Sequence, residues 1–375
     1  MEILFSVASF LATFFLGFFA EKLLDKLIGK ISQLRKKRAN KRAKEKMKAQ
    51  EIHAIFTEDI FPPISSDNIW IQEEDASFFL AFPDELKDEV KKHLRAEDAP
   101  FAEKDHCFCD LTLPGFSDES IRSAIETARL EVAQKFVKRE DGLYFNGEKY
   151  GVCRLDAKGR SATIDETPQL IADLYHTDYF THRVVLRAAE LLNIPTENLT
   201  GDSLNTSYRW LRTSLGVSVV VVLKSTNQIV MTRRSKNASF SDGNEWIYVS
   251  VTEALSHSDF DAYDKKVSLS LCVERGLKEE LGIDTSMYCY NNIRFYDCFF
   301  ETDFFQDGIV SSVTLYDKIL PAQVQSLRAK DKRLEISEIF FIDNNKAAIR
   351  KFITENRAEM RSQTIFALES YAASL

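Results

Sequence analysis

The sequence lacks the patterns typical of zinc-binding and nucleic-acid-binding proteins. Its six cysteines form no pair of C-x-x-C motifs, which argues against a structural zinc ribbon. The nearest grouping is the run His106-Cys107-Phe108-Cys109, and it has no matching second half. An excess of basic residues is also missing, because 49 Lys and Arg face 57 Asp and Glu, for a net charge of −8. We therefore expect no binding to a DNA or RNA duplex.

Charge is also absent from the beginning of the chain. Residues 3–20 carry no charged side chain, and eleven of these eighteen are Leu, Ile, Val or Phe. As a helix, eighteen residues extend about 27 Å, close to the hydrocarbon thickness of a bilayer. The sequence therefore predicts a transmembrane anchor over residues 1–21. The Met-Glu start does not fit a cleaved signal peptide.

A basic segment follows this apolar one. Residues 21–50 contain twelve Lys or Arg and three acidic residues, so residues 51–375 carry a net charge of −16. We interpret residues 22–50 as a basic amphipathic stalk that contacts anionic lipid headgroups. The positive-inside rule then predicts a single-pass protein of the cell inner membrane, with the N-terminus outside and the C-terminal body in the cytoplasm.

Small residues share one face of the predicted anchor. Ser9, Thr13 and Gly17 are spaced by four residues, which places them above one another on a helix. Small faces allow close approach of helices within membranes, where apolar burial gives no driving force. This face is the predicted assembly surface of a homo-oligomer.

The rest of the chain is predicted to form an α/β or α+β body, divided into an intermediate region (51–200) and a C-terminal domain (201–375). Hydrophobic periodicity and turn residues locate its elements. Helices are expected over 117–138, 167–193, 202–215 and 264–281 and from 345 onward. A hairpin is expected over 143–154 around Asn146-Gly147. Strands are expected over 217–223, 229–233, 246–251, 293–300, 309–316 and 339–342.

One segment of the C-terminal domain suggests chemistry. It reads Arg275-Gly276-Leu277-Lys278-Glu279-Glu280-Leu281-Gly282-Ile283. With the preceding strands, it resembles the Nudix signature G-x5-E-x7-R-E-U-x-E-E-x-G-U, in which U is aliphatic. The resemblance covers about residues 216–345 and implies a Nudix-like α/β/α sandwich. In that family, carboxylates on one helix face hold Mg²⁺ against a diphosphate, and the metal activates water.

The resemblance implies roles for several residues. Glu279, Glu280 and Arg275 are the catalytic candidates. Glu279 and Glu280 would hold Mg²⁺ together with Glu253, if an insertion brings Glu253 to the upstream position. Phosphate and base recognition would fall to Arg233, Arg234 and Trp246. The alternative is a purely structural amphipathic helix in which Arg275 pairs with Glu279.

The signature is incomplete. Gly276 stands where the family has a glutamate, Val267 where it has a second one, and Asp261 where it has a glycine. Losing a carboxylate weakens divalent binding, because hard cations depend on the number and charge of their ligands. A nucleotide can still bind to such a site. The sequence is therefore more consistent with a binding domain than with an enzyme.

The order of anchor, basic stalk, intermediate region and degenerate Nudix-like domain resembles the SMODS-associated NUDIX family. Members are proposed membrane effectors of CBASS, a bacterial anti-phage defence based on CD-NTase nucleotide cyclases. The resemblance implies that the domain senses a cyclic oligonucleotide while the span oligomerises to disrupt the inner membrane. The alternative is a membrane-tethered Nudix hydrolase of a nucleoside diphosphate derivative. An inert scaffold is a third possibility.

Overall fold

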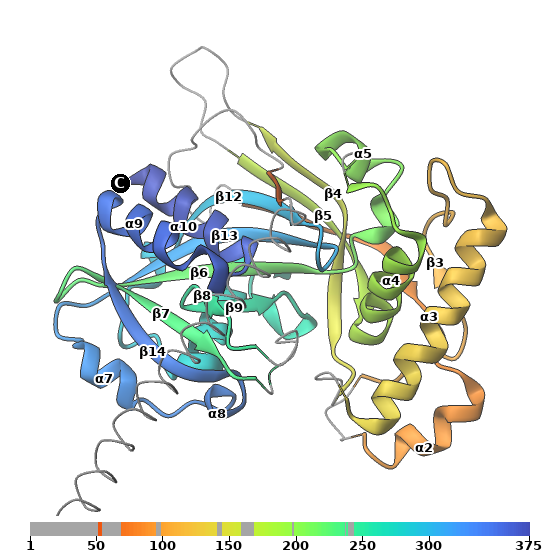
Figure 1. Ribbon diagram of the computed structural model, residues 1–375, viewed down its shortest axis with the longest axis horizontal. Coiled ribbons are helices and arrows are strands. Elements are labelled where there is room, and N and C mark those ends of the chain that lie inside the picture. Colours follow the sequence, from red (N-terminus) through yellow and green to blue (C-terminus); the bar gives the residue numbers. More distant parts are fainter. Residues whose placement is uncertain are drawn as a thin grey trace, which may run out of the picture. The chain divides into compact units, whose positions relative to one another are not determined.

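The computed structural model describes residues 52–54, 69–94, 99–140, 145–158, 169–196, 199–236, 238 and 244–375. The stretch Gln50–Leu375 forms one compact unit. Two mixed β-sheets, a small two-stranded sheet and the packed helices make up the described part of this unit (Figure 1). Helices and strands do not alternate regularly along the chain, so the fold class is α+β.

The larger sheet has eight strands among the described residues. Six follow the order β1-β12-β13-β6-β7-β14, while β8 pairs with β7 and β9 pairs with β6. β6 and β13 run parallel, with Leu215 opposite Asp307 and Leu223 opposite Leu315. The other pairings in this sheet are antiparallel. Its strands are β1 (Ile52–Ala54), β6 (Leu215–Leu223), β7 (Gln228–Arg234), β8 (Ile247–Tyr248), β9 (Val251–Ala254), β12 (Arg294–Glu301), β13 (Gln306–Leu315) and β14 (Ile336–Asp343).

β6 lies in the interior of this sheet and is buried on both faces. Eight of its nine residues are buried, and most are valine or leucine, as expected for a strand with a parallel neighbour. The predicted strands at 217–223, 229–233, 293–300, 309–316 and 339–342 are confirmed as β6, β7, β12, β13 and β14.

The single strand predicted over 246–251 is wrong. The chain instead forms β8 on β7 and then β9 on β6. Ser250 lies at the change of partner, where its hydroxyl accepts from Val221 N at 2.8 Å and donates to Val230 O at 2.5 Å. The side chain thus replaces backbone bonds of the ladder and allows the chain to switch strands.

The smaller sheet has the order β3-β2-β5-β4. Two long helices, α3 and α4, pack side by side on the right in Figure 1. They share a core with the sheet that includes Phe78, Ile125, Tyr175 and Phe180. The elements are β2 (Ile69–Phe79), β3 (His106–Cys107), α3 (Asp118–Lys138), β4 (Glu148–Lys158), β5 (Gln169–Asp178) and α4 (Tyr179–Leu192).

Capping residues determine where two of the predicted helices begin. Ser117 accepts a bond from Ser120 N at the start of α3, and Asn345 accepts one from Ala348 N at the start of α9. Both helix predictions are confirmed. The helical segment predicted over 202–215 is confirmed only in part: α5 ends at Asn205, a 3-10 turn covers Arg209–Leu211, and β6 begins at Leu215. The remaining helices are α2 (Lys87–Lys91), α5 (Gly201–Asn205), α6 (Leu269–Gly276), α7 (Pro321–Ser326), α8 (Lys332–Glu335), α9 (Lys346–Asn356) and α10 (Ser362–Ser374).

The helix predicted over 167–193 is wrong in its first half. Residues 169–178 form β5, which pairs with β2 on one side and β4 on the other. The helix starts only after Asp178, whose carboxylate accepts from Thr181 N at 2.7 Å. Two flanking strands thus override the local helical pattern. The predicted helix end at Asn193 is correct, since Asn193 adopts the left-handed conformation with φ 50°.

The hairpin predicted around Asn146-Gly147 is also wrong. Asn146 is buried, and its side chain donates to Asp178 and accepts from Phe180 N at 2.9 Å. Among the described residues, the strand that follows it, β4, pairs with β5 and with no preceding strand. The residue expected at an exposed turn instead anchors the start of α4.

The predicted combination of a transmembrane helix with an α/β/α sandwich is corrected. No helix in the described part of the chain is long and apolar enough to cross a bilayer. The longest of these, α3, has 21 residues but carries charged side chains along its length. The fold is an α+β body with mixed sheets. The same finding on helix length and apolarity contradicts the predicted single-pass localisation in the inner membrane. The predicted anchor (1–21), stalk (22–50) and assembly face (Ser9, Thr13, Gly17) lie outside the described residues.

A buried ion pair links the larger sheet to the smaller one. Arg212 binds Asp307 of β13 through two bonds of 2.9 and 2.5 Å, and both side chains are at most 1% exposed. Arg212 also donates to Asn205 Oδ1 at 2.6 Å. Its carbonyl accepts from Val152 N of β4 and from the hydroxyl of Tyr175 of β5. One residue therefore contacts β4, β5 and β13.

Removing one partner of this pair should strongly destabilise the fold. We expect Asp307→Ala to lower the free energy of unfolding by about 3–5 kcal/mol, because it leaves the Arg212 guanidinium buried without its counter-ion. Denaturant unfolding followed by tryptophan fluorescence measures the change. The matched control is Asp317→Ala, which breaks an exposed pair with Lys224 and should cost at most about 1 kcal/mol. Equal effects of the two substitutions would contradict the role given to Arg212.

Candidate functional site

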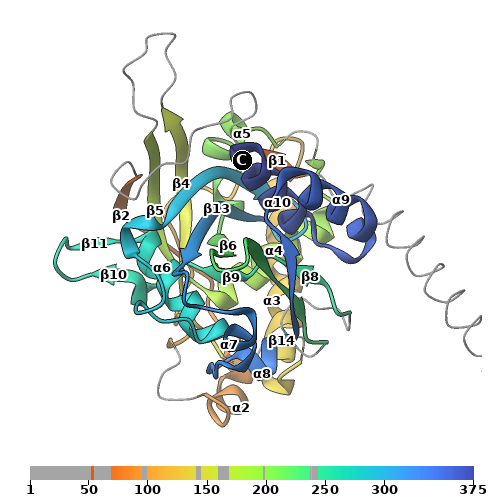
Figure 2. The same ribbon diagram turned by 90° about the vertical axis from the view of Figure 1, so that its left-hand side faces the viewer.

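The candidate site is built on α6 and the π-helical turn that continues it (Leu277–Leu281). Ser268 begins the helix by accepting from Leu271 N at 3.4 Å. Gly282 ends the turn with φ 75°, a conformation that favours glycine. The predicted helix over 264–281 therefore starts five residues late. The preceding residues form a small hairpin of β10 (Phe260–Asp261) and β11 (Lys266–Val267), which projects at the left of Figure 2.

Arg275 is the centre of the site. Its guanidinium donates to both carboxylate oxygens of Asp259 at 2.8 Å and to the carbonyl of Ala254 at 2.7 Å. It also pairs with Glu253 at 2.9 Å and with Glu279 at 3.7 Å. Burial opposes the charge, but the bonds to Asp259 and the charge of Glu253 raise the pKa of Arg275 overall. Arg275 is thus a fixed cation that holds three carboxylates around itself.

Close packing against β9 explains why residue 276 is a glycine. A Cβ at this position would lie 2.8 Å from Val251 Cγ1 and 2.9 Å from Glu253 Cβ. The helix therefore packs directly on β9, and no room exists for the glutamate of the Nudix signature. Glu253 of β9 lies beside this position. A glutamate on a strand is therefore next to the point where the signature has a glutamate on the helix.

Two carboxylates of the site are held in an unfavourable environment. Burial and the charges of Glu335 and Glu253 raise the pKa of Glu280 well above its usual value. Burial also raises the pKa of Glu253, although Arg275 opposes the shift. Arg234 of β7 reaches the same region, where it pairs with Glu335 at 3.3 Å. We call this group the α6 site: Arg234, Glu253, Asp259, Arg275, Glu279, Glu280 and Glu335.

An aromatic cluster adjoins the α6 site. Arg234 lies 5.2 Å over the ring of Tyr248, and Arg234 N donates to the carbonyl of Trp246 at 2.8 Å. In this register Arg234, Trp246 and Tyr248 share one face of the β7–β8 pair. Arg361 stacks on Trp246 at 4.5 Å and lies 5.0 Å from the Phe304 ring.

The predicted residues are therefore only partly brought together. Arg234, Glu253, Arg275, Glu279 and Glu280 meet, with Trp246 next to them. Arg233 faces the other side of β7, where it pairs with Glu338 at 3.3 Å and Glu359 at 3.1 Å. Sequence reasoning did not identify Asp259, Glu335 and Arg361.

The proposed magnesium ligands are already engaged. Glu253 and Glu279 both pair with Arg275, and Glu279 lies 3.8 Å from Lys330. Within the described ranges, no group of three or more His, Cys, Asp or Glu has an arrangement that could hold a metal ion. As arranged here, the carboxylates do not fit a bound Mg²⁺, and the magnesium site remains a prediction.

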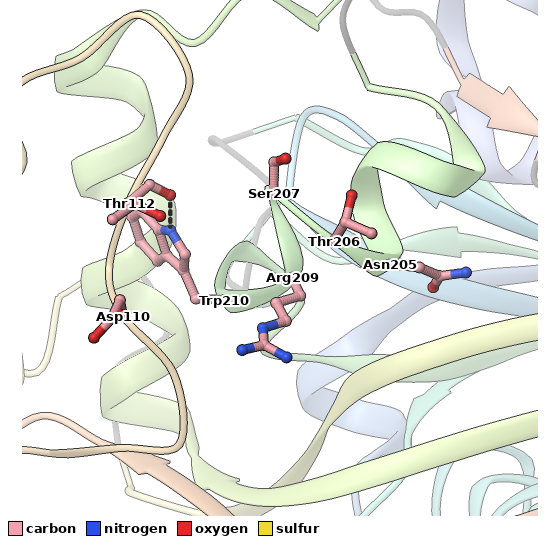
Figure 3. Close-up of a pocket in the computed structure, with 7 residues that line it drawn as sticks. All are labelled: Asp110, Thr112, Asn205, Thr206, Ser207, Arg209 and Trp210. Carbon is pink, nitrogen blue, oxygen red and sulfur yellow. Dashed lines mark hydrogen bonds between the residues drawn. The ribbon is translucent and has the colours of Figure 1, made fainter.

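A separate pocket, which shares no lining residue with the α6 site, lies between the loop after β3 and the segment from α5 to Trp210 (Figure 3). Its volume is about 410 Å³, and its lining is mostly polar. Trp210 Nε1 donates to the carbonyl of Thr112 at 2.9 Å and so closes one wall. The lining residues are Asp110, Thr112, Asn205, Thr206, Ser207, Arg209 and Trp210.

Comparison with known proteins gives little help. No protein-family model matches the sequence, and no curated protein matches it. Among solved structures, the chain is similar to DR0079 from Deinococcus radiodurans, with 14% sequence identity. The match covers 42% of this chain and 81% of that one, at a TM-score of 0.29. A likeness at this level supports no conclusion about fold or function.

The close contact at Gly276 can be tested directly. We expect Gly276→Ala to lower the free energy of unfolding by about 1–3 kcal/mol, because the new methyl group meets Val251 and Glu253. This loss should outweigh the intrinsic helix preference of alanine, worth up to about 1 kcal/mol. Gly147→Ala is the control, since its Cβ would meet the exposed Phe145 ring at 3.3 Å. A stabilised Gly276→Ala protein would show that α6 does not pack on β9 as described.

The raised pKa of Glu280 predicts a pH-dependent stability. Because the folded-state pKa lies above the unfolded one, the contribution of this group is favourable at low pH and is lost as the pH rises. Glu280→Gln removes that loss, so its stability relative to the wild type should increase from about pH 5 to about pH 8. Denaturant unfolding at both pH values measures the trend. Glu355→Gln, at an exposed pair on α9, should change stability by less than about 1 kcal/mol at either pH. A Glu280→Gln effect on stability that is independent of pH would contradict a raised pKa of Glu280.

Proposed function

We propose that this protein binds a nucleotide at the α6 site and acts as the sensor of a cyclic oligonucleotide in bacterial anti-phage signalling. The signalling context comes from the sequence resemblance to the SMODS-associated NUDIX family, which rests on the order of segments along the chain and on the motif at residues 275–283. Binding without turnover is proposed because Glu253 and Glu279 pair with Arg275 and the pKa of Glu280 is raised. We also propose that the bound protein is a homo-oligomer.

The arrangement at Gly276 carries the proposal. Metal-dependent hydrolysis needs several ionised carboxylates directed at one cation. Here Glu253 and Glu279 are directed at Arg275, and burial raises the pKa of Glu280. A glutamate at 276 has no space. This arrangement favours recognition of a ligand over its hydrolysis.

The neighbouring residues supply the chemistry that a nucleotide needs. An arginine binds phosphate oxygens through charge-assisted hydrogen bonds, and aromatic rings stack on bases. Arg234 and the half-buried Trp246 share one face of the β7–β8 pair. Arg234 is paired with Glu335 at 3.3 Å. A phosphate would compete with Glu335 for this guanidinium, so binding would change the link between β7 and α8.

A Nudix-type hydrolase is the second candidate, and one observation favours it. Glu280 Oε1 is buried and has no hydrogen-bond partner among the described residues. Such an oxygen is open to a cation or a proton donor from a ligand. The two candidates differ in turnover, which can be measured.

Calorimetric titration tests the proposal, with cyclic di-AMP, cyclic tri-AMP and ATP as probes, each with Mg²⁺ or with EDTA. We expect one cyclic probe to bind in both conditions. Trp246→Ala should weaken that binding by about 1–3 kcal/mol, or roughly 5- to 150-fold, through loss of stacking, and Trp246→Phe should largely retain it. Light scattering with the bound probe should show a homo-oligomer.

The control is Arg350→Met, an exposed residue on α9. It should leave the affinity unchanged. Affinity that is equally insensitive to Trp246→Ala would place the ligand elsewhere. Turnover of any probe at about 1–10³ s⁻¹, abolished by Glu280→Gln, would overturn sensing in favour of hydrolysis.

A further inference from the structure

Two cysteines outside the α6 site lie close enough to react with each other. Cys107 ends β3, and the backbone bends at Phe108 and Cys109. This bend brings Cys109 back toward Cys107, so that their sulfur atoms are 3.9 Å apart. Residues two apart in a straight strand would hold their Cα atoms about 6.6 Å apart, with parallel side chains. The C-x-C spacing therefore becomes a thiol pair only through the local fold.

The segment that carries the pair is held in place on both sides. Asp105 accepts from Ala81 N at 2.7 Å and pairs with Arg129 of α3 at 2.6 Å. On the other side, the ring of Phe108 packs on Tyr175 at 4.5 Å. Both cysteines are half-buried and neither is in a disulfide. The pair is thus fixed in position while it remains within reach of small molecules.

The surroundings activate one thiol and not the other. The contact between the two sulfur atoms, in which either thiol can donate, and the positive charge of Arg209 lower the pKa of Cys109 to about 7. The same interaction raises the pKa of Cys107. Arg209 stacks on Phe108 at 5.3 Å and also lines the polar pocket of Figure 3. Near neutral pH, Cys109 is the better nucleophile and Cys107 keeps its proton.

We propose that Cys107 and Cys109 form a peroxide-sensitive thiol pair, in which Cys109 attacks the oxidant and Cys107 then closes a disulfide. This site is independent of the proposed nucleotide function. The sulfur atoms need to approach by about 2 Å to reach bonding distance, within the range of side-chain rotation. Cys153, which packs against the same core, is the competing thiol.

The reaction balances with a hydroperoxide as the oxidant. The Cys109 thiolate attacks one peroxide oxygen, so an S–O bond forms and the O–O bond breaks, and the leaving oxyanion takes a proton. The resulting sulfenic acid is attacked by the sulfur of Cys107, which loses its proton. An S–S bond forms and water leaves. The two thiols lose two electrons, and the hydroperoxide gains them.

Mass spectrometry of the 375-residue chain tests the pair. Reduced protein is treated with hydrogen peroxide, the remaining thiols are alkylated, and the peptides are quantified. We expect a Cys107–Cys109 disulfide to form before Cys289, a half-buried thiol elsewhere, is oxidised. Alkylation of Cys109 should rise with pH around a midpoint near 7 and be about three- to fourfold faster at neutral pH than that of a free cysteine, because the larger thiolate fraction outweighs the lower nucleophilicity.

Variants separate the two roles. Cys107→Ala should abolish the disulfide, leave a sulfenic acid on Cys109 that dimedone traps, and slow alkylation of Cys109 several-fold. Cys109→Ala should protect Cys107 from peroxide, and Cys289→Ser is the matched control with wild-type behaviour. A Cys109–Cys153 disulfide in the wild type, or oxidation of Cys109 no faster than that of Cys289, would overturn the proposal. Circular dichroism of each variant checks that the fold is retained.

Discussion

The structure depends on the buried charge of Arg212. A guanidinium without contact to water is tolerated only when counter-charge and hydrogen-bond acceptors surround it. Asp307 and Asn205 supply these acceptors. Because Asp307 begins the pairing of β13 with β6, the ion pair aligns the centre of the larger sheet. The carbonyl of Arg212 accepts from Val152 N, so the smaller sheet is aligned by the same residue. Loss of this residue would therefore affect both sheets at once.

The α6 site is the second place where charge is concentrated in the interior. Arg275 resembles Arg212 in being surrounded by acceptors, but here the carboxylates outnumber the cations. Burial, together with the charge of neighbouring carboxylates, raises the pKa of Glu253 and of Glu280. An excess of buried negative charge costs stability, and folds retain such a cost mainly where it serves binding or catalysis. The raised pKa values therefore fall on the same residues as the sequence motif.

Much of the fold could be predicted from local pattern, and the failures have specific causes. Five strands of the larger sheet, β6, β7, β12, β13 and β14, were predictable because their apolar runs are bounded by turns. Residues 169–178 were misread as helix because their strand character comes from β2 and β4, which no local window includes. Asp259 was missed because the β10–β11 hairpin separates it from α6 and shifts the expected spacing. Glu335 is 55 residues beyond Glu280, and only the tertiary fold brings it near.

The parallel pairing of β6 with β13 has a consequence for how the molecule folds. These neighbours are 92 residues apart in the chain, so the sheet cannot close its centre until the whole intervening segment has been looped out. That segment contains β7, β9, α6 and β12, and therefore most of the α6 site. Strand pairs of such high contact order form late and slowly. The site residues would then reach their final positions in the last stage of folding, together with the sheet that supports them.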